Sequence, residues 1–211
     1  TEGNYSVGQV YLVGADNPLS AKKQVLESKE AILRRANQQD PVLINKGGGA
    51  QDLEVKVIQG KDGLILRVHL LVDTKDAMGA NAINKMAEAI APLIEKLGGG
   101  KSVLKIVSNL PEQKVVRAET LITKEALEKE GPQSEEIIER VLIAQKIAEK
   151  DIHRAVTHNK GILNGVGAVA LATGNDWRAV EAAAHGFAAK SGRYLPLTSW
   201  EKNGAGDLRG E

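Results

Sequence analysis

The order of hydrophobic periods along the first half of the chain restricts its fold more than any other feature. Residues 7–14, VGQVYLVG, alternate apolar and polar side chains as a half-buried strand does. Asn17 and Pro18 then provide a helix N-cap and a first-turn proline, and apolar residues recur at helical spacing up to Asn37. We therefore expect a strand followed by one helix whose buried face carries Leu19, Val25, Leu26, Ile32, Leu33 and Ala36.

Three more strand-like runs and a second helix complete this half. Two of the runs, LEVKVIQ and LILRVHLLV, flank the turn residues GKDG and indicate a hairpin. Apolar residues at helical spacing from Gly79 to Leu97 predict a helix that ends at Gly98, and SVLKIVS follows as a strand. The βαββαβ order predicts an α+β class with a ferredoxin-like domain over residues 4–108, an antiparallel sheet carrying two helices on one face.

Residues 109–211 have a different, helix-rich pattern. A strand is expected around Val115 to Ile122, and polar helical stretches cover residues 124–129 and 134–150. A segment of small residues, GILNGVGAVALATG, then precedes a helix that begins after Asp176. The final segment, LPLTSWEKNGAGDLRG, shows a strand and a turn with no returning strand. We therefore expect an incomplete large domain, whose last strand pairs with other sequence or another subunit.

Composition excludes several classes of function. Lys+Arg number 28 against 27 Asp+Glu, so the net charge of +1 gives no overall field for nucleic acid or an anionic membrane. Aromatic residues are 3% of the chain, too few for RNA binding by base stacking. Cysteine is absent and the four histidines lack metal-ligand spacing, so we predict no metal. With no long apolar run and no signal peptide, the sequence predicts a cytoplasmic protein without a membrane segment.

Two stretches carry candidate site chemistry, and each has a simpler interpretation. RAVTHNKGILNG, residues 154–165, gathers Arg154, His158 and Lys160 before small, flexible residues. A lysine can polarise a carbonyl and an arginine can grip a carboxylate, although isolated lysines are usually solvated. DAMGAN, residues 76–81, opens the second predicted helix, where a ligand can approach the backbone closely. On residue types alone, Asp76 and Asp176 are better explained as helix N-caps.

Three strings are more specific than this chemistry. They are DAMGANAINKMAEAIAPL at 76–93, RAVTHNKGILNG at 154–165, and ATGNDWRAVEAAAHGFAAKSGRYLPLTSWEK at 172–202. Together they strongly resemble the soluble class II 3-hydroxy-3-methylglutaryl-coenzyme A (HMG-CoA) reductases, and the similarity extends over nearly the whole chain. The family reduces HMG-CoA to mevalonate and coenzyme A by two hydride transfers from a nicotinamide cofactor.

The resemblance implies a nucleotide-binding role for the small domain, which is inserted in a large domain that binds HMG-CoA. It places Asp40 at the adenosine ribose, and a carboxylate there would repel a ribose 2′-phosphate. We therefore expect NADH to be preferred, with NADPH as the alternative. Along the cofactor the resemblance places Asp76, Met78, Gly79 and Asn81.

The resemblance also implies the catalytic residues. Lys160 corresponds to the family's catalytic lysine, which polarises the thioester carbonyl and then the aldehyde, and Asp176 to the aspartate coupled to it. Asn164 corresponds to an asparagine of this network, Arg154 to a contact of the substrate carboxylate, and Asn109 to a polar residue of the substrate site. The family acts as a dimer or higher oligomer with the active site at the subunit interface, so we expect a homo-oligomer.

The sequence departs from the family in two places. The catalytic glutamate of an ENVIG-type motif and the histidine that protonates the departing thiolate have no counterpart. We therefore expect the chain to be a central portion of such an enzyme, whose own activity is in doubt. The alternative is a cofactor-binding or structural fragment without activity of its own.

Overall fold

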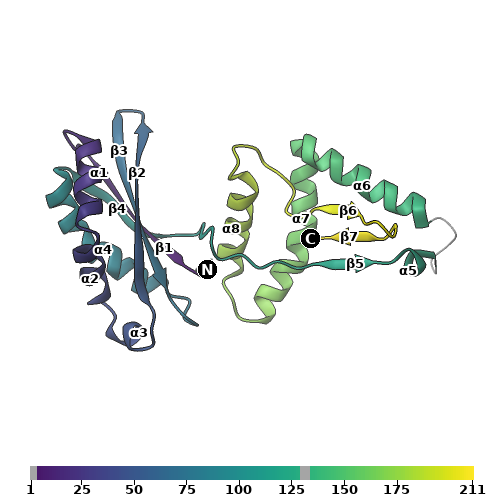
Figure 1. The fold of residues 1–211 in the computed structure, drawn as a ribbon, viewed down its shortest axis with the longest axis horizontal. Coiled ribbons are helices and arrows are strands. Elements are labelled where there is room, and N and C mark those ends of the chain that lie inside the picture. Colours follow the sequence, from purple (N-terminus) through teal and green to yellow (C-terminus); the bar gives the residue numbers. More distant parts are fainter. Residues whose placement is uncertain (1–3, 129–133) are drawn as a thin grey trace. The chain divides into compact units, whose positions relative to one another are not determined.

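The computed structural model describes residues 4–128 and 134–211. These residues divide into two compact units, Thr1–Lys114 and Val115–Glu211, which are described separately below (Figure 1). The structure is of mixed α/β type, and both of its sheets are antiparallel. Within the described ranges, no helix is long and apolar enough to span a membrane.

The first unit is a four-stranded sheet in the order β2-β3-β1-β4. Figure 1 shows helices α1, α2 and α4 on one face of this sheet. In chain order, the elements are β1 (Ser6–Val13), α1 (Pro18–Glu27), α2 (Lys29–Asn37), α3 (Pro41–Asn45), β2 (Gly49–Gly60), β3 (Gly63–Asp73), α4 (Ala80–Gly98) and β4 (Lys101–Ser108).

The core of this unit lies between the sheet and the helices. Alternate residues of each strand face the helices, because side chains of a strand point to opposite faces in turn. On α4, apolar residues at helical spacing face the sheet. Fully or almost fully buried are Val10, Leu12, Leu66, Val68, Leu70, Ile83, Met86, Ile90 and Ile94. The amphipathic patterns read from the sequence are therefore confirmed for β1, β3 and α4.

The helix expected from residue 18 to residue 37 is two helices. The Asn17 side chain accepts a hydrogen bond from the Ser20 N–H at 3.0 Å, which confirms the predicted cap. The chain then turns at Ser28, whose φ of −91° and ψ of 9° end α1. The buried face nevertheless continues across this break: Val25, Ile32 and Ala36 are fully buried and Leu33 packs against the core, as predicted. The prediction is wrong for the other two residues, since Leu19 is 70% and Leu26 39% exposed.

The second unit contains four helices and a small sheet in the described ranges. These elements are β5 (Thr120–Ile122), α5 (Lys124–Glu128), α6 (Ser134–Lys150), α7 (Ile152–Ala172), α8 (Trp177–Ala189), β6 (Trp200–Lys202) and β7 (Leu208–Gly210). The strand predicted from Val115 is shorter than expected and begins at Thr120. Lys129, at the end of the stretch predicted as 124–129, lies outside the described residues.

Two predictions for this unit are wrong. The last segment does have a returning strand, because β7 pairs with both β5 and β6 in a sheet of order β5-β7-β6. Residues 154–165 are not a flexible stretch, because they lie within the single 21-residue helix α7. The glycines at 161, 165 and 167 continue that helix.

Candidate functional site

The candidate residues fall into two groups, one in each unit. The first unit contains the predicted cofactor residues Asp40, Asp76, Met78, Gly79 and Asn81, and also Asn109, which follows β4. The second unit contains Arg154, Lys160, Asn164 and Asp176. The sequence pattern places Asn109 at the start of the large domain, whereas in the structure it lies within the first compact unit.

The loop between β3 and α4 is held by Asp73 at the end of β3. The Asp73 carboxylate accepts hydrogen bonds from the Lys75 backbone N–H at 2.9 Å and pairs with Lys75 Nζ at 2.8 Å. These hydrogen bonds from Lys75 hold the pKa of Asp73 below its ordinary value. Lys75 itself has a left-handed backbone, with φ of 50°. The loop therefore begins with a tight turn fixed by one carboxylate.

Gly79 is required by two features of this loop. Its φ is 80°, a region that favours glycine. A Cβ at this position would lie 2.4 Å from Cγ2 of Thr74, a side chain that is only 1% exposed. Gly79 is also the N-cap of α4, so the interpretation of Asp76 as that cap is wrong. Asp76 and Asn81 are exposed, and Met78 is 74% exposed.

Asp40 is the N-cap of the short helix α3, and its Oδ1 accepts a hydrogen bond from the Leu43 N–H at 2.9 Å. The turn after α3 lies against the end of β3. Gly49 is paired with Asp73, and a Cβ on Gly48 would lie 2.7 Å from the Asp73 carbonyl oxygen. The structure therefore brings the α3 turn and the loop that carries Asp76 to the same end of the sheet.

Lys114 is a charged neighbour of this loop that the sequence did not reveal. Its Nζ donates a hydrogen bond to Thr74 Oγ1 at 3.2 Å. Burial lowers the pKa of Lys114, and the nearby negative charge of Asp73 opposes this shift. Lys75 and Lys114 thus flank Asp73 beside the predicted cofactor loop. No motif marks a loop lysine whose partner lies 40 residues away.

In the second unit, Lys160 and Asn164 lie on α7, one turn apart and therefore on the same side of the helix. Both side chains are exposed, whereas Arg154 is half-buried. His158 Nε2 lies 2.6 Å from Thr198 Oγ1. Burial, and next the positive charge of Arg154, lower the pKa of His158. The helix thus presents Lys160 and Asn164 to solvent while its other side is fixed.

Asp176 is the N-cap of α8. Its Oδ1 accepts a hydrogen bond from the Ala179 N–H at 3.2 Å and lies 3.9 Å from Arg178 Nε. The capping interpretation is therefore confirmed. No ion pair joins Asp176 to Lys160, although the structure describes both residues. The described residues also contain no group of three or more histidine or acidic side chains placed to hold a metal ion.

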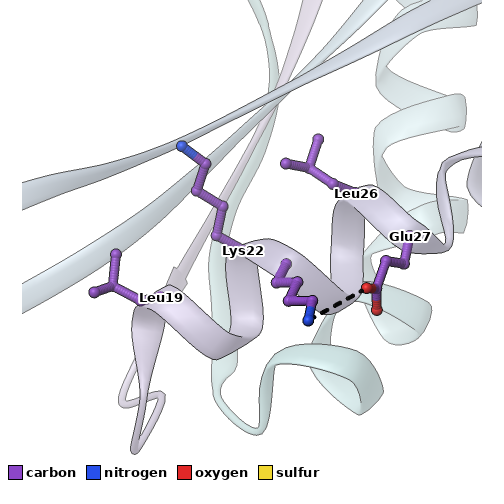
Figure 2. A pocket seen from close by; sticks show the side chains of 5 residues that line it. Leu19, Lys22, Leu26 and Glu27 are labelled. Atoms are coloured by element: carbon purple, nitrogen blue, oxygen red, sulfur yellow. Dashed lines mark ion pairs between the residues drawn. The ribbon is translucent and has the colours of Figure 1, made fainter.

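Two surface hollows lie away from every candidate residue. Figure 2 shows the first on the outer face of α1, where Lys23 and Glu27 form an ion pair at 3.8 Å. It is lined by Leu19, Lys22, Lys23, Leu26 and Glu27. The second lies between α4 and β4 and is lined by Glu88, Ala91, Pro92, Glu95, Ser102 and Lys105. Neither of these two hollows is therefore the predicted cofactor or substrate site.

Comparisons with known proteins identify the family. The model of the family described as hydroxymethylglutaryl-coenzyme A reductase matches residues 1–211. The 3-hydroxy-3-methylglutaryl-coenzyme A reductase of Archaeoglobus fulgidus is 46% identical over 208 residues, which are 99% of this chain and 46% of that protein. A probable reductase of this name from Borreliella burgdorferi is 38% identical over 164 residues, 76% of this chain and 38% of that protein.

Solved structures agree with this result. A 3-hydroxy-3-methylglutaryl-coenzyme A reductase from Streptococcus pneumoniae matches with a TM-score of 0.94 and 42% identity, covering 98% of this chain and 49% of that one. The class II enzyme of the same species, bound to NADPH in open conformations, matches with the same score and identity and is covered to 50%. The chain thus spans about half the length of these relatives. The resemblance read from the sequence is confirmed, and the chain belongs to the hydroxymethylglutaryl-coenzyme A reductase family.

Proposed function

We propose that the protein reduces HMG-CoA to mevalonate and coenzyme A with a nicotinamide dinucleotide as the hydride donor. The single observation that carries this proposal is Lys160, an exposed cation on α7 with Asn164 one turn further, in a chain that matches the family along its whole length. In this proposal residues 4–108 form the nucleotide-binding domain and residues 109–211 form part of the HMG-CoA-binding domain, although residues 109–114 lie in the first compact unit.

We propose a ferredoxin-like fold for the nucleotide-binding domain. Two features support it: the order β2-β3-β1-β4 of an antiparallel sheet, and helices that follow β1 and β3 along the chain. Such a domain needs no glycine-rich dinucleotide motif of the Rossmann type, and the sequence contains none. Its ligand surface is then the end of the sheet where α3 and the β3–α4 loop meet.

The residues at this end fit a dinucleotide. Met78 offers an exposed apolar side chain for a planar ring, and Asp76, Gly79 and Asn81 would lie along the rest of the molecule. The first-turn N–H groups of α4 have no acceptor within the helix and favour an anion. Lys75 and Lys114 add positive charge beside the loop. When bound, the nicotinamide group supplies hydride.

We propose that Asp40 favours NADH over NADPH. One carboxylate oxygen caps α3, so the other can accept a ribose hydroxyl, whereas a 2′-phosphate there would meet a negative charge. The relative from Streptococcus pneumoniae is described as bound to NADPH, so the preference has to be measured on this protein. Asp40→Asn, which keeps an oxygen for the cap, should improve NADPH binding relative to NADH. Equal affinities for the two cofactors before the change would contradict the role of Asp40.

The proposed catalytic step rests on electrostatics. Reducing a thioester to an alcohol takes two hydrides, and negative charge develops on the substrate oxygen each time. Lys160 Nζ would donate a hydrogen bond to that oxygen and stabilise the charge where it forms. Asp176 would be coupled to the lysine and Asn164 would hold the network. Arg154 would bind the substrate carboxylate with its planar fork, and Asn109 would contact the substrate.

We further propose a homodimer or higher oligomer in which the active site lies at the subunit interface. Exposed apolar side chains on α7, among them Val156, Val169 and Leu171, support this assignment. A second candidate function is a cofactor-binding or structural fragment without turnover. The absence of a hydrogen bond or ion pair between the described residues Lys160 and Asp176 favours it.

Lys160→Met in the complete natural chain tests the proposal, because methionine keeps the length of the side chain and removes the charge. HMG-CoA-dependent oxidation of NADH should fall by about 100-fold or more. Calorimetric titration should show unchanged NADH binding. Lys146→Met, at an exposed position on α6, is the matched control and should leave turnover unchanged. Full activity of Lys160→Met would refute the catalytic role of Lys160. NADH binding with no turnover in the unaltered 211-residue chain would favour the second candidate function, a cofactor-binding or structural fragment.

A further inference from the structure

The segment Arg193–Thr198, which we name the strap, is fastened to three helices of the second unit by side chains. At one end, the Arg193 guanidinium donates to the Glu149 carbonyl of α6 at 3.1 Å. Tyr194 Oη lies 2.6 Å from His185 Nδ1 of α8. Side-chain anchors from several elements fix a segment that has no regular structure of its own. The strap is therefore a defined part of the unit.

Asn159 of α7 provides the central anchor. Its side chain is completely buried, and both ends of its amide are used. Nδ2 donates to the Leu195 carbonyl at 2.9 Å, and Oδ1 accepts from the Leu197 N–H at 2.8 Å. A buried amide that lost either partner would be left with an unsatisfied polar group. The two bonds therefore hold Asn159 at one place on the strap.

Thr198 adds a third attachment next to this pair. Its hydroxyl lies 2.6 Å from His158 Nε2 of α7, and its carbonyl accepts a hydrogen bond from Gln145 Nε2 of α6 at 3.0 Å. His158 and Asn159 are consecutive on α7, so two neighbouring side chains of this helix are bound to the strap. Together they fix the rotation of α7 about its own axis.

The next residue of α7 is Lys160. Successive residues are about 100° apart around a helix, so Lys160 points away from the strap to the exposed side. With side chains at about 5–6 Å from the axis, a helix rotation of about 20° would move the end of either side chain by about 2 Å. Such a movement would break both Asn159 bonds. The direction of Lys160 is thus linked to bonds on the other side of the helix.

We infer that Asn159 is a positioning residue for Lys160, and that the strap is the frame against which it acts. This inference rests on the proposed catalytic role of Lys160. Asn159 touches no substrate; it fixes the helix rotation, and a displacement of about 1 Å in a catalytic group can cost about 100-fold in rate. The consecutive residues His158 and Asn159 thus anchor the helix, and Lys160 is the side chain whose direction they fix.

The test is a double-mutant cycle in the complete natural chain, with turnover of HMG-CoA as the readout. Asn159→Leu keeps the volume of the side chain and removes both hydrogen bonds. We expect it to lower kcat by about 10- to 100-fold with little change in the KM for NADH. In the Lys160→Met background, the same change should have no further effect on the residual rate, because the group that Asn159 positions is gone.

Ile138→Ala is the control for loss of stability alone, because Ile138 is a fully buried apolar side chain of α6 and forms no hydrogen bond to the strap. It should lower the Tm without lowering kcat. Equal losses of kcat in Asn159→Leu and Ile138→Ala at equal loss of Tm would overturn the inference. An additive effect of Asn159→Leu in the Lys160→Met background would also overturn the inference. That result would not contradict the catalytic role of Lys160.

Full activity of Lys160→Met alone would refute both the proposed function and this inference. The results described above for Asn159→Leu would refute the inference only, so the two failures are distinguishable. If Asn159→Leu does not fold, Thr198→Val gives the same cycle. It removes only the hydroxyl that lies beside His158 and keeps the carbonyl bond to Gln145. The expected loss of kcat is then smaller but again absent in the Lys160→Met background. A loss that persists in that background would overturn the inference.

Discussion

Gly79→Ala should destabilise the first unit by two separate effects. The alanine backbone would have to adopt a φ of 80°, which costs about 1–2 kcal/mol for a residue other than glycine. The added Cβ would also lie 2.4 Å from Thr74 Cγ2, and crowding of this kind in a packed region costs about 1–3 kcal/mol. The free energy of unfolding should therefore fall by about 2–5 kcal/mol, out of the total of about 5–15 kcal/mol that is ordinary for a domain.

The other end of α4 offers a matched control. Gly99 also has a positive φ, 71°, but a Cβ there would have no atom within 4 Å. Gly99→Ala should therefore cost only about 1–2 kcal/mol. Thr74→Ser removes the methyl group that the new Cβ would meet and keeps the hydroxyl bonded by Lys114. In that background, the cost of Gly79→Ala should fall but stay above that of Gly99→Ala, because the Cβ of residue 74 would still lie 2.8 Å from the new Cβ.

Hydrogen exchange of the amides of α4 measures these differences in the first unit alone. Ile90 and Ile94 are fully buried, so their amides should exchange only when the unit unfolds. Calorimetry on the same variants should show weaker NADH binding for Gly79→Ala and partial recovery with Thr74→Ser, since the loop that bears Asp76 and Met78 would move to relieve the contact. Equal costs of Gly79→Ala and Gly99→Ala would refute the steric argument.

Two further predictions concern single side chains. Asp176→Asn keeps an oxygen to cap α8 and removes the charge, so circular dichroism should show unchanged helix content while turnover falls at least 10-fold. Asp176→Ala should in addition lose about 1 kcal/mol of stability, because it also removes the cap. Full turnover of Asp176→Asn would limit this residue to capping. Burial, and next the positive charges of Arg67 and Lys56, lower the pKa of His69 to about 4 from the ordinary 6.5. The unfolded chain therefore binds a proton at a higher pH than the folded unit, so stability is complete above about pH 6.5 and is lost as the pH falls toward 4. Since the ring is partly exposed, about 1–2 kcal/mol is expected from this group. Denaturant titrations of His69→Gln should lack this loss, and an unchanged pH dependence would show that other groups cause it.

The parts of the fold that the sequence predicted are those with long amphipathic patterns. Helix α4 was found to within a residue or two at each end, because its apolar stripe is continuous and glycines flank it. The break at Ser28 carries neither glycine nor proline, so nothing in the periodicity marked it. Strands of three residues, such as β7, are too short for an alternation to be seen, and their partners come from distant sequence.

Helix α7 shows how tertiary contacts overcome local preference. Glycine in a helix interior costs about 1 kcal/mol relative to alanine, so the glycines at 161, 165 and 167 favoured a looser stretch. The helix nevertheless continues to Ala172. Asn159, itself a weak helix former, is fixed to the strap by two hydrogen bonds with residues 36 and 38 positions away. Contacts at that separation cannot be read from a local pattern.

The types of the candidate site residues were accessible from the sequence, through the resemblance, but their surroundings were not. The brace between Lys114 and Thr74 joins two loops, and neither loop carries a motif. Likewise, the sequence predicted the capping role of Asp176 but not that of Asp40, and the resemblance gives both carboxylates a role in the site. A carboxylate has two oxygens, so a cap and a ligand contact do not exclude each other.

The exposure of Lys160 sets a condition on catalysis. The attraction between a lysine and a developing oxyanion 4 Å away is about 1 kcal/mol in water and about 4 kcal/mol at the effective dielectric constant of a partly covered site. On the side of α7 that carries the lysine, Val156 and Leu171 are exposed apolar side chains, and apolar surface of this kind is stabilised when another surface covers it. Covering this side of α7 would therefore remove water from the apolar residues and, at the same time, strengthen the attraction between Lys160 and the oxyanion. If the proposed function is right, nicotinamide binding, which we assign to the first unit, should not depend on that cover, whereas efficient turnover should.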